Sequence, residues 1–259
     1  MTDIKLNRRQ VLATGVAGST MTLIPNMSLA ATTWDMPSAY GAGNFISKAY
    51  AAFGEDVSTR TNGDLAITLH PAGSLYSGGD ILRAVREGQV PIGGRFLGAH
   101  SKQVPLLGLD TVPFLATTRA QSRKLYDVSK DAIGAALEEI GLKLLFAPVW
   151  PPQGLFSKKE VKTVDDMNGV KFRAYDASTT RLAELMGAVP TQTEASEIAQ
   201  AFSTGVAESM IASGAIGFWY ARSGYLCFEL YVELCFELRF EICFDLLFDL
   251  IFNTLCTLL

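Results

Sequence analysis

Arg173 is the residue whose type and position best suit binding chemistry. It lies near the carboxyl end of a predicted strand, residues 170–175, in which apolar and polar residues alternate. In open α/β sheets, ligands bind in the crevice beyond the carboxyl ends of the strands. A guanidinium group there can hold a carboxylate through two parallel hydrogen bonds. The spacing equally allows a surface arginine paired with Asp176, so both interpretations stay open at this point.

A second candidate group follows a predicted buried strand at residues 142–147. Trp150 comes just after this strand, and Pro151 and Pro152 restrict the loop that presents Gln153. An aromatic wall with one amide group is a typical lining of small-molecule pockets. A tryptophan at the edge of a hydrophobic core would explain the same residues equally well.

Catalytic chemistry finds little support in the sequence. It contains no Gly-x-Ser-x-Gly motif, and its two histidines, His70 and His100, lack a metal-ligand spacing. Residues 41–43 read Gly-Ala-Gly and lack the third glycine of a dinucleotide-binding loop. We therefore expect no enzyme activity, no metal and no cofactor. A hydrolase or a dehydrogenase is the alternative from another class.

Alternating strands and helices are predicted to position these residues. Residues 170–211 read strand–helix–strand–helix–strand, with Gly187 and Gly205 ending the two helices. Before them, strands are predicted at residues 32–36, 65–70, 90–96 and 142–147, and helices at residues 45–61, 77–88 and 119–140. This order predicts an α/β fold with a largely parallel sheet.

The first 30 residues have the pattern of an export signal. Lys5, Arg8 and Arg9 precede a weakly apolar stretch, and Ser-Leu-Ala at residues 28–30 supplies small residues for cleavage. The arginine pair resembles the twin-arginine signal. We expect residues 1–30 to be removed near Ala30 and the mature protein to be periplasmic. A membrane anchor would need about 20 strongly apolar residues, and polar residues interrupt this stretch.

Charge and cysteine content limit the partners and the folding route. The chain has 22 Lys and Arg against 26 Asp and Glu, a formal net charge of −4, and no basic block. Nucleic acid is therefore not an expected partner. The four cysteines all lie from Cys227 onward, so the earlier part of the chain must fold without disulfide bonds.

Several segments are similar to the periplasmic solute-binding subunits of TRAP transporters (tripartite ATP-independent periplasmic transporters), of the dicarboxylate-binding-protein type. The matching segments are residues 70–75, 81–89, 112–117, 164–173, 187–190 and 197–205. The most specific is the Gly-Val-Lys-Phe-Arg sequence that ends at Arg173. The resemblance extends over about residues 31–216. It implies a two-lobed α/β fold with a ligand cleft between the lobes, assigned here to residues 31–150 and 151–216.

The resemblance also implies the contents of the site. A family arginine clamps the ligand carboxylate, and Arg173 stands at its position, whereas Gln153 replaces a second arginine that many members carry. The aromatic lining favours a monocarboxylate or an aromatic acid over a C4-dicarboxylate. The further residues expected to line the cleft are Trp34, Tyr40, Trp150, Arg95, Tyr175 and Ser213. The implied partners are a small organic acid and the two membrane subunits of the transporter, to which the protein delivers its ligand.

The resemblance stops abruptly near residue 217. Residues 227–250 form three eight-residue units that read Cys-Phe-acid-Leu-x-x-acid-aliphatic. Even positions from Phe228 to Phe252 are all apolar, which fits a strand, whereas on a helix the acids would form a like-charge stripe. Because family members continue with more of both lobes, we expect residues 217–259 to be an aberrant tail and the fold to be incomplete. A truncated product that no longer binds ligand is the alternative.

Overall fold

The computed structural model of the chain describes residues 31–214, 216 and 228–230. The predicted export signal, and the octad-repeat tail apart from residues 228–230, lie outside the described residues. Within these ranges, no helix is both long and apolar enough to cross a membrane. The proposed lobe boundary at residue 150 stays a prediction.

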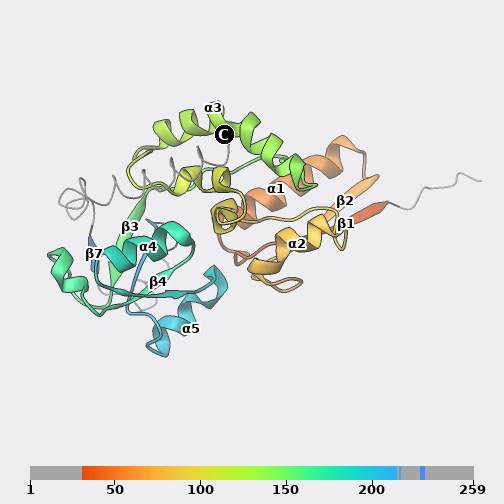
Figure 1. Cartoon of the computed structure of the whole chain (residues 1–259). Coiled ribbons are helices and arrows are strands. Elements are labelled where there is room, and N and C mark those ends of the chain that lie inside the picture. Colours follow the sequence, from red (N-terminus) through yellow and green to blue (C-terminus); the bar gives the residue numbers. More distant parts are fainter. Residues whose placement is uncertain (1–30, 215, 217–227, 231–259) are drawn as a thin grey trace, which may run out of the picture. The chain divides into compact units, whose positions relative to one another are not determined.

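A two-stranded parallel sheet begins the described chain. It consists of β1 (Thr32–Pro37) and β2 (Leu65–His70), joined by helix α1 (Phe45–Arg60), which packs against β2 (Figure 1). The side chain of Asn44 caps α1 by accepting a hydrogen bond from the backbone N–H of Ile46 at 2.8 Å. Both strands and the helix therefore form where the sequence predicts them.

Short helical segments and one long helix follow. They are η1 (Gly78–Asp80), α2 (Ile81–Arg86), η2 (Leu97–His100), η3 (Pro105–Thr111) and α3 (Arg119–Glu139). Thr118 and Gln121 form a reciprocal capping box at the start of α3. The long helix is thus confirmed, while the helix predicted from Ser77 divides into a 3-10 turn and the short α2.

Two predicted strands are wrong. Residues 90–96 make a single β-bridge, between Gly94 and Ser38, and residues 142–152 contain no helix or strand. Leu145, expected to be buried, is 54% exposed. A strand needs a neighbouring strand for its backbone hydrogen bonds, and none of the described residues pairs with this segment. An apolar run alone could not reveal that.

A five-stranded sheet forms the second half of the described chain, in the order β5-β4-β6-β3-β7. The strands are β3 (Gln153–Ser157), β4 (Lys171–Ala174), β5 (Val189–Gln192), β6 (Ser209–Ser213) and β7 (Phe228–Leu230), with helices α4 (Ala177–Leu185) and α5 (Ile198–Ser203) between them (Figure 1). The parallel strands β5, β4 and β6 confirm the predicted strand–helix order. β3 differs from the expected parallel sheet because it runs antiparallel to both β6 and β7.

Two apolar clusters hold the helices on this sheet. One contains Val161, Met167, Phe172, Ala183, Met186 and Ala188, and the other contains Phe156, Ile198, Ala201, Phe202, Ala207, Met210 and Ala212. Phe172 lies in β4 and is fully buried. Because successive side chains of a strand point to opposite faces, the same strand directs Arg173 away from the cluster that contains Phe172.

Candidate functional site

Arg173 is almost fully buried, with 4% of its surface exposed. Its Nε donates a hydrogen bond to the backbone carbonyl of Thr193, just after β5, at 3.0 Å. Its guanidinium carbon lies 5.0 Å from the ring centroid of Tyr175. This burial excludes the alternative of a solvated surface arginine. A cation in such surroundings is held by ring and carbonyl groups and presents a strong field to an anionic ligand.

Aromatic side chains form a wall beside Arg173. The ring of Tyr175 makes an edge contact with Phe96 at 5.7 Å between centroids. Trp150 makes similar contacts with Tyr40, at 5.2 Å, and with Phe45, at 5.1 Å. Burial raises the pKa of both tyrosines above the ordinary value for tyrosine. Both hydroxyl groups are therefore neutral at physiological pH and able to donate a hydrogen bond.

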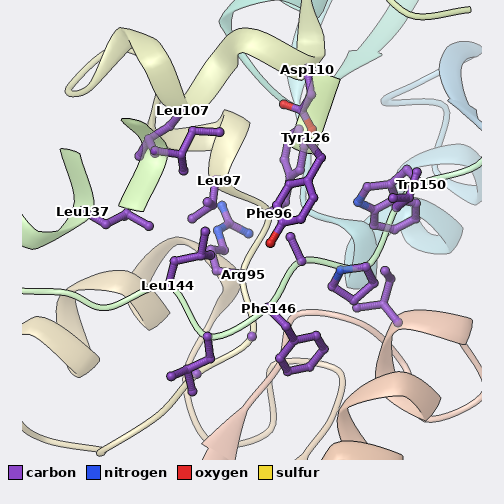
Figure 2. A pocket seen from close by; sticks show the side chains of 18 of the residues that line it. Arg95, Phe96, Leu97, Leu107, Asp110, Tyr126, Leu137, Leu144, Phe146 and Trp150 are labelled. Atoms are coloured by element: carbon purple, nitrogen blue, oxygen red, sulfur yellow. The ribbon is translucent and has the colours of Figure 1, made fainter. Parts of the chain in front are cut away.

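A cavity of about 610 Å³ adjoins this wall. Residues 91–97 and 141–153 line it without interruption, together with parts of α3 and η3. In Figure 2, Phe96 comes from the first stretch, and Phe146 and Trp150 come from the second. A cavity of this size with a largely apolar lining is suited to a small molecule.

The predicted site residues fall into two groups in the structure. Those that line the cavity are Trp34, Tyr40, Arg95, Trp150 and Gln153. The others, Arg173, Tyr175 and Ser213, lie outside its lining, although Tyr175 contacts Phe96 of the wall and Ser213 is the cross-strand partner of Gln153. The fold thus brings the predicted residues to one region. Their contact with a ligand stays a prediction.

An amide and a hydroxyl lie side by side at one end of the β3–β6 pair. Gln153 begins β3, and its Nε2 donates to the backbone carbonyl of Pro151 at 3.2 Å. Ser213, opposite it in β6, is 1% exposed, and its hydroxyl has no hydrogen-bond partner among the described residues. Buried hydroxyl groups normally have a partner, so this one is a reasonable contact for a polar ligand atom.

Arg95 is the second cation of the region. It forms an ion pair with Glu194, which the sequence did not indicate as a site residue. Its Nη1 and Nη2 donate to the two carboxylate oxygens of Glu194, at 2.8 and 2.9 Å, and its Nε contacts His100 Nε2 at 3.4 Å. Glu194 follows the predicted helix cap Thr193, where an acidic residue is ordinarily solvated. Its role depends on a partner 99 residues away, which no local pattern indicates.

Two carboxyl groups that sequence reasoning also missed as site elements lie near Tyr175. Asp176 is 2% exposed and caps α4, accepting hydrogen bonds from the backbone N–H and hydroxyl of Thr179 at 2.7 and 2.6 Å. Asp110 lines the cavity. Burial, with a smaller contribution from the charge of Asp176, raises the pKa of Asp110 to about 6.

Asp110 should make stability depend on pH. Its pKa of about 6 in the folded protein exceeds the value of about 3.9 expected when unfolded. The folded state therefore binds more protons between these values, and stability falls as the pH rises from about 4 to about 6. Asp110 is exposed as a whole residue, although its carboxyl group is shielded beside the cavity, so screening should limit the effect to about 1 kcal/mol.

Asp110→Asn should flatten this profile and raise the melting temperature near neutral pH. Thermal unfolding between about pH 4.5 and about pH 7.5 measures both effects. Asp131→Asn, an exposed residue of α3, is the matched control and should preserve the wild-type slope. Parallel profiles for wild type and Asp110→Asn would contradict the assignment.

The described residues contain no group of three or more His, Cys, Asp or Glu side chains that could hold a metal ion. The chemistry available in the region is hydrogen bonding, cation–anion attraction and aromatic contact. This set suits recognition of a small anionic molecule. The expected lack of metal and cofactor stays a prediction.

Comparison with solved structures identifies close relatives. A TRAP solute-binding protein from a marine metagenome, specific for pyroglutamate and crystallised with co-purified pyroglutamate, is 40% identical, with a TM-score of 0.76 over 85% of this chain and 76% of that chain. DctP6 of Bordetella pertussis, an extracytoplasmic solute receptor binding pyroglutamic acid, is 36% identical, with a TM-score of 0.74 over 85% of this chain and 77% of that chain. These likenesses confirm the predicted two-lobed fold.

A curated sequence relative is longer than this chain. The uncharacterized protein y4mM of Sinorhizobium fredii is 28% identical over 216 residues, which are 79% of this chain but 39% of that protein. The chain thus spans about two fifths of the length of this relative.

The family profile described as "Bacterial extracellular solute-binding protein, family 7" matches residues 38–215. These residues include β2 to β6, the aromatic wall and Arg173. Proteins of this family act outside the cytoplasm and bind solutes, and they are not enzymes. The chain belongs to the DctP family of bacterial extracellular solute-binding proteins, as the resemblance of its sequence to TRAP solute-binding subunits predicted.

Proposed function

We propose that this protein captures a small monocarboxylic acid, pyroglutamate or a close analogue, outside the cytoplasm and delivers it unchanged to the two membrane subunits of a TRAP transporter. The two similar structures described above, at 40% and 36% identity, are both pyroglutamate-binding proteins. The export signal predicted in residues 1–30, with cleavage near Ala30, agrees with a periplasmic location.

The observation that carries this proposal is the buried Arg173. Its side chain lies against the Tyr175 ring and beside the end of β5. In an environment that excludes water, a carboxylate is the natural counter-ion of a guanidinium group, and the two can form a planar, two-pronged contact. We assign to Arg173 the role of binding the ligand carboxylate.

The remaining polar groups favour one carboxylate rather than two. Gln153 stands where many relatives carry a second arginine, and the hydroxyl of Ser213 lies across the strand pair from it. An amide and a hydroxyl complement the N–H and carbonyl of a lactam better than a second charge does. Trp150 and Tyr40 offer aromatic surface to the ring. Pyroglutamate combines these features.

A thermal-unfolding series on the purified protein tests the proposal. Pyroglutamate should stabilise the protein, by about 2.7 kcal/mol at a concentration of 100 times Kd. Three analogues identify the recognised groups: 2-pyrrolidinone lacks the carboxylate, proline lacks the lactam carbonyl, and succinate carries a second carboxylate. We expect 2-pyrrolidinone not to bind, proline to bind more weakly than pyroglutamate, and succinate not to stabilise the protein.

The same series can contradict the proposal. If succinate stabilises the protein and pyroglutamate does not, the ligand is a dicarboxylate and not a monocarboxylate. If 2-pyrrolidinone stabilises the protein as much as pyroglutamate does, the protein does not recognise the carboxylate. Chemical analysis of pyroglutamate after incubation tests capture without turnover, because a binding protein should return it unchanged.

A further inference from the structure

An ion pair joins the two sheets of the described chain beside the ligand site. Arg95 follows Gly94, which bridges to Ser38 next to β1, so it belongs to the side of the two-stranded sheet. Glu194 comes two residues after β5 of the other sheet. The contact is two-pronged, and the side chains are 8% and 32% exposed, respectively. Of the ion pairs between described residues, it joins the most distant segments of the chain.

The ion pair is mechanically connected to Arg173. The Nε of Arg173 holds the carbonyl of Thr193 at 3.0 Å, and the N–H of Thr193 donates to the carbonyl of Ala174 at 3.0 Å. Glu194 is the next residue after Thr193. A shift of Arg173 toward a ligand would therefore move or tighten the backbone that presents the Glu194 carboxylate. The charges of Arg95, Glu194 and Arg173 all act on the buried Tyr40 hydroxyl, which places the ion pair and Arg173 in one electrostatic environment.

The backbone at Gly78 packs closely against the ion pair of Arg95 and Glu194. A Cβ at this position would lie 2.5 Å from Glu194 Oε2 and 2.6 Å from Arg95 Nη1, closer than real Cβ atoms approach such groups. The backbone of η1 thus comes directly against the ion pair. Close packing limits water around a charged contact and strengthens it.

We propose that Arg95 and Glu194 are positioning residues that latch the two sheets together around the bound ligand, without themselves holding its carboxylate. The assignment rests on the proposed function, because the latch acts on the ligand that Arg173 binds. It gives Arg95 a role other than the direct ligand contact expected from sequence. The latch favours the closed arrangement and so mainly slows ligand dissociation.

Glu194→Gln is the main test, because it removes one charge and keeps the size of the side chain. We expect its affinity for pyroglutamate to fall about tenfold to hundredfold, because the dissociation rate rises by more than the association rate does. The reversed pair, Arg95→Glu with Glu194→Arg, should recover part of the loss. A residue with a merely structural role would not show this rescue. Stopped-flow binding gives both rate constants.

Two further variants keep the test specific. Gly78→Ala leaves every charge in place but forces a methyl group against the ion pair, so it should also speed dissociation. Asp56→Asn breaks an exposed ion pair with Arg60 within α1, and its affinity should stay within about twofold of wild type. Circular dichroism checks folding, and if Glu194→Gln is not folded, Gly78→Ala provides the same test.

Small-angle X-ray scattering without ligand separates this proposal from the proposed function. Glu194→Gln should have a larger radius of gyration than wild type, because the latch is lost. If wild type fails to bind pyroglutamate while Glu194→Gln still expands, the proposed ligand is wrong and the latch stands. If Glu194→Gln and Gly78→Ala both have the dissociation rate and the radius of gyration of the wild type, the latch proposal is wrong.

Discussion

Arg173→Ala is expected to weaken binding of the carboxylate ligand by at least about 100-fold. Each charge-assisted hydrogen bond from a shielded guanidinium contributes about 1.5–3 kcal/mol, and a two-pronged contact loses two of them. The sum corresponds to a loss of about 100-fold to about 10,000-fold in affinity. Isothermal titration calorimetry with pyroglutamate measures the change.

One further variant separates charge from geometry in this experiment, and another is the matched control. Arg173→Lys keeps the positive charge but not the planar fork, so its affinity should lie between wild type and Arg173→Ala. Arg181→Ala removes an exposed arginine of α4 that pairs with Glu184 at 3.4 Å, and it should bind as wild type does. If Arg173→Ala binds within about threefold of wild type, the carboxylate is held elsewhere.

Arg173→Ala should also change the ligand-free protein, and this effect must be measured separately. The substitution removes the hydrogen bond from Nε to the carbonyl of Thr193 and the contact with Tyr175. We expect a loss of about 1–2 kcal/mol in the free energy of unfolding. This loss is too small to unfold a typical domain, so the affinity can be measured on folded protein.

The part of the fold that could be predicted from sequence is the part specified by local patterns. From β4 to β6, alternation, helical spacing and terminal glycines occur together. Gly187 and Gly205 each adopt a φ of 71°, which glycine tolerates and which ends a helix. Arg173 can be predicted as a candidate binding residue from sequence because its position depends only on β4 and its carboxyl end.

What the sequence could not reveal depends on distant partners. Residues 142–147 are apolar enough for a buried strand, yet strand formation needs a neighbour that a local pattern cannot supply. Glu194 and Asp110 are ordinary acids in sequence, and only contacts with other segments bring them to the site region. Glu194 forms an ion pair with Arg95, and Asp110 lines the cavity. Tertiary contacts, rather than residue type, give these side chains their roles.

Phe172→Ala, one residue before Arg173, is expected to cost about 3–5 kcal/mol in the free energy of unfolding. Phe172 is fully buried in the cluster that attaches α4 to the sheet. Its removal leaves a cavity between β4 and α4 that the surrounding side chains can fill only in part. Because a typical domain is stable by about 5–15 kcal/mol in total, this single change should remove a large share of its stability.

Chemical denaturation of Phe172→Ala measures this cost. Phe172→Leu, which keeps most of the apolar volume, should lose far less, and Val128→Ala, at a position 72% exposed on α3, should lose almost nothing. Affinity measured well below the unfolding transition should change little in Phe172→Ala, because this side chain points away from Arg173. Adjacent residues of one strand would then have separable roles, Phe172 in stability and Arg173 in ligand binding. A loss below about 1 kcal/mol in Phe172→Ala would mean that this cluster repacks freely and does not hold β4 in place.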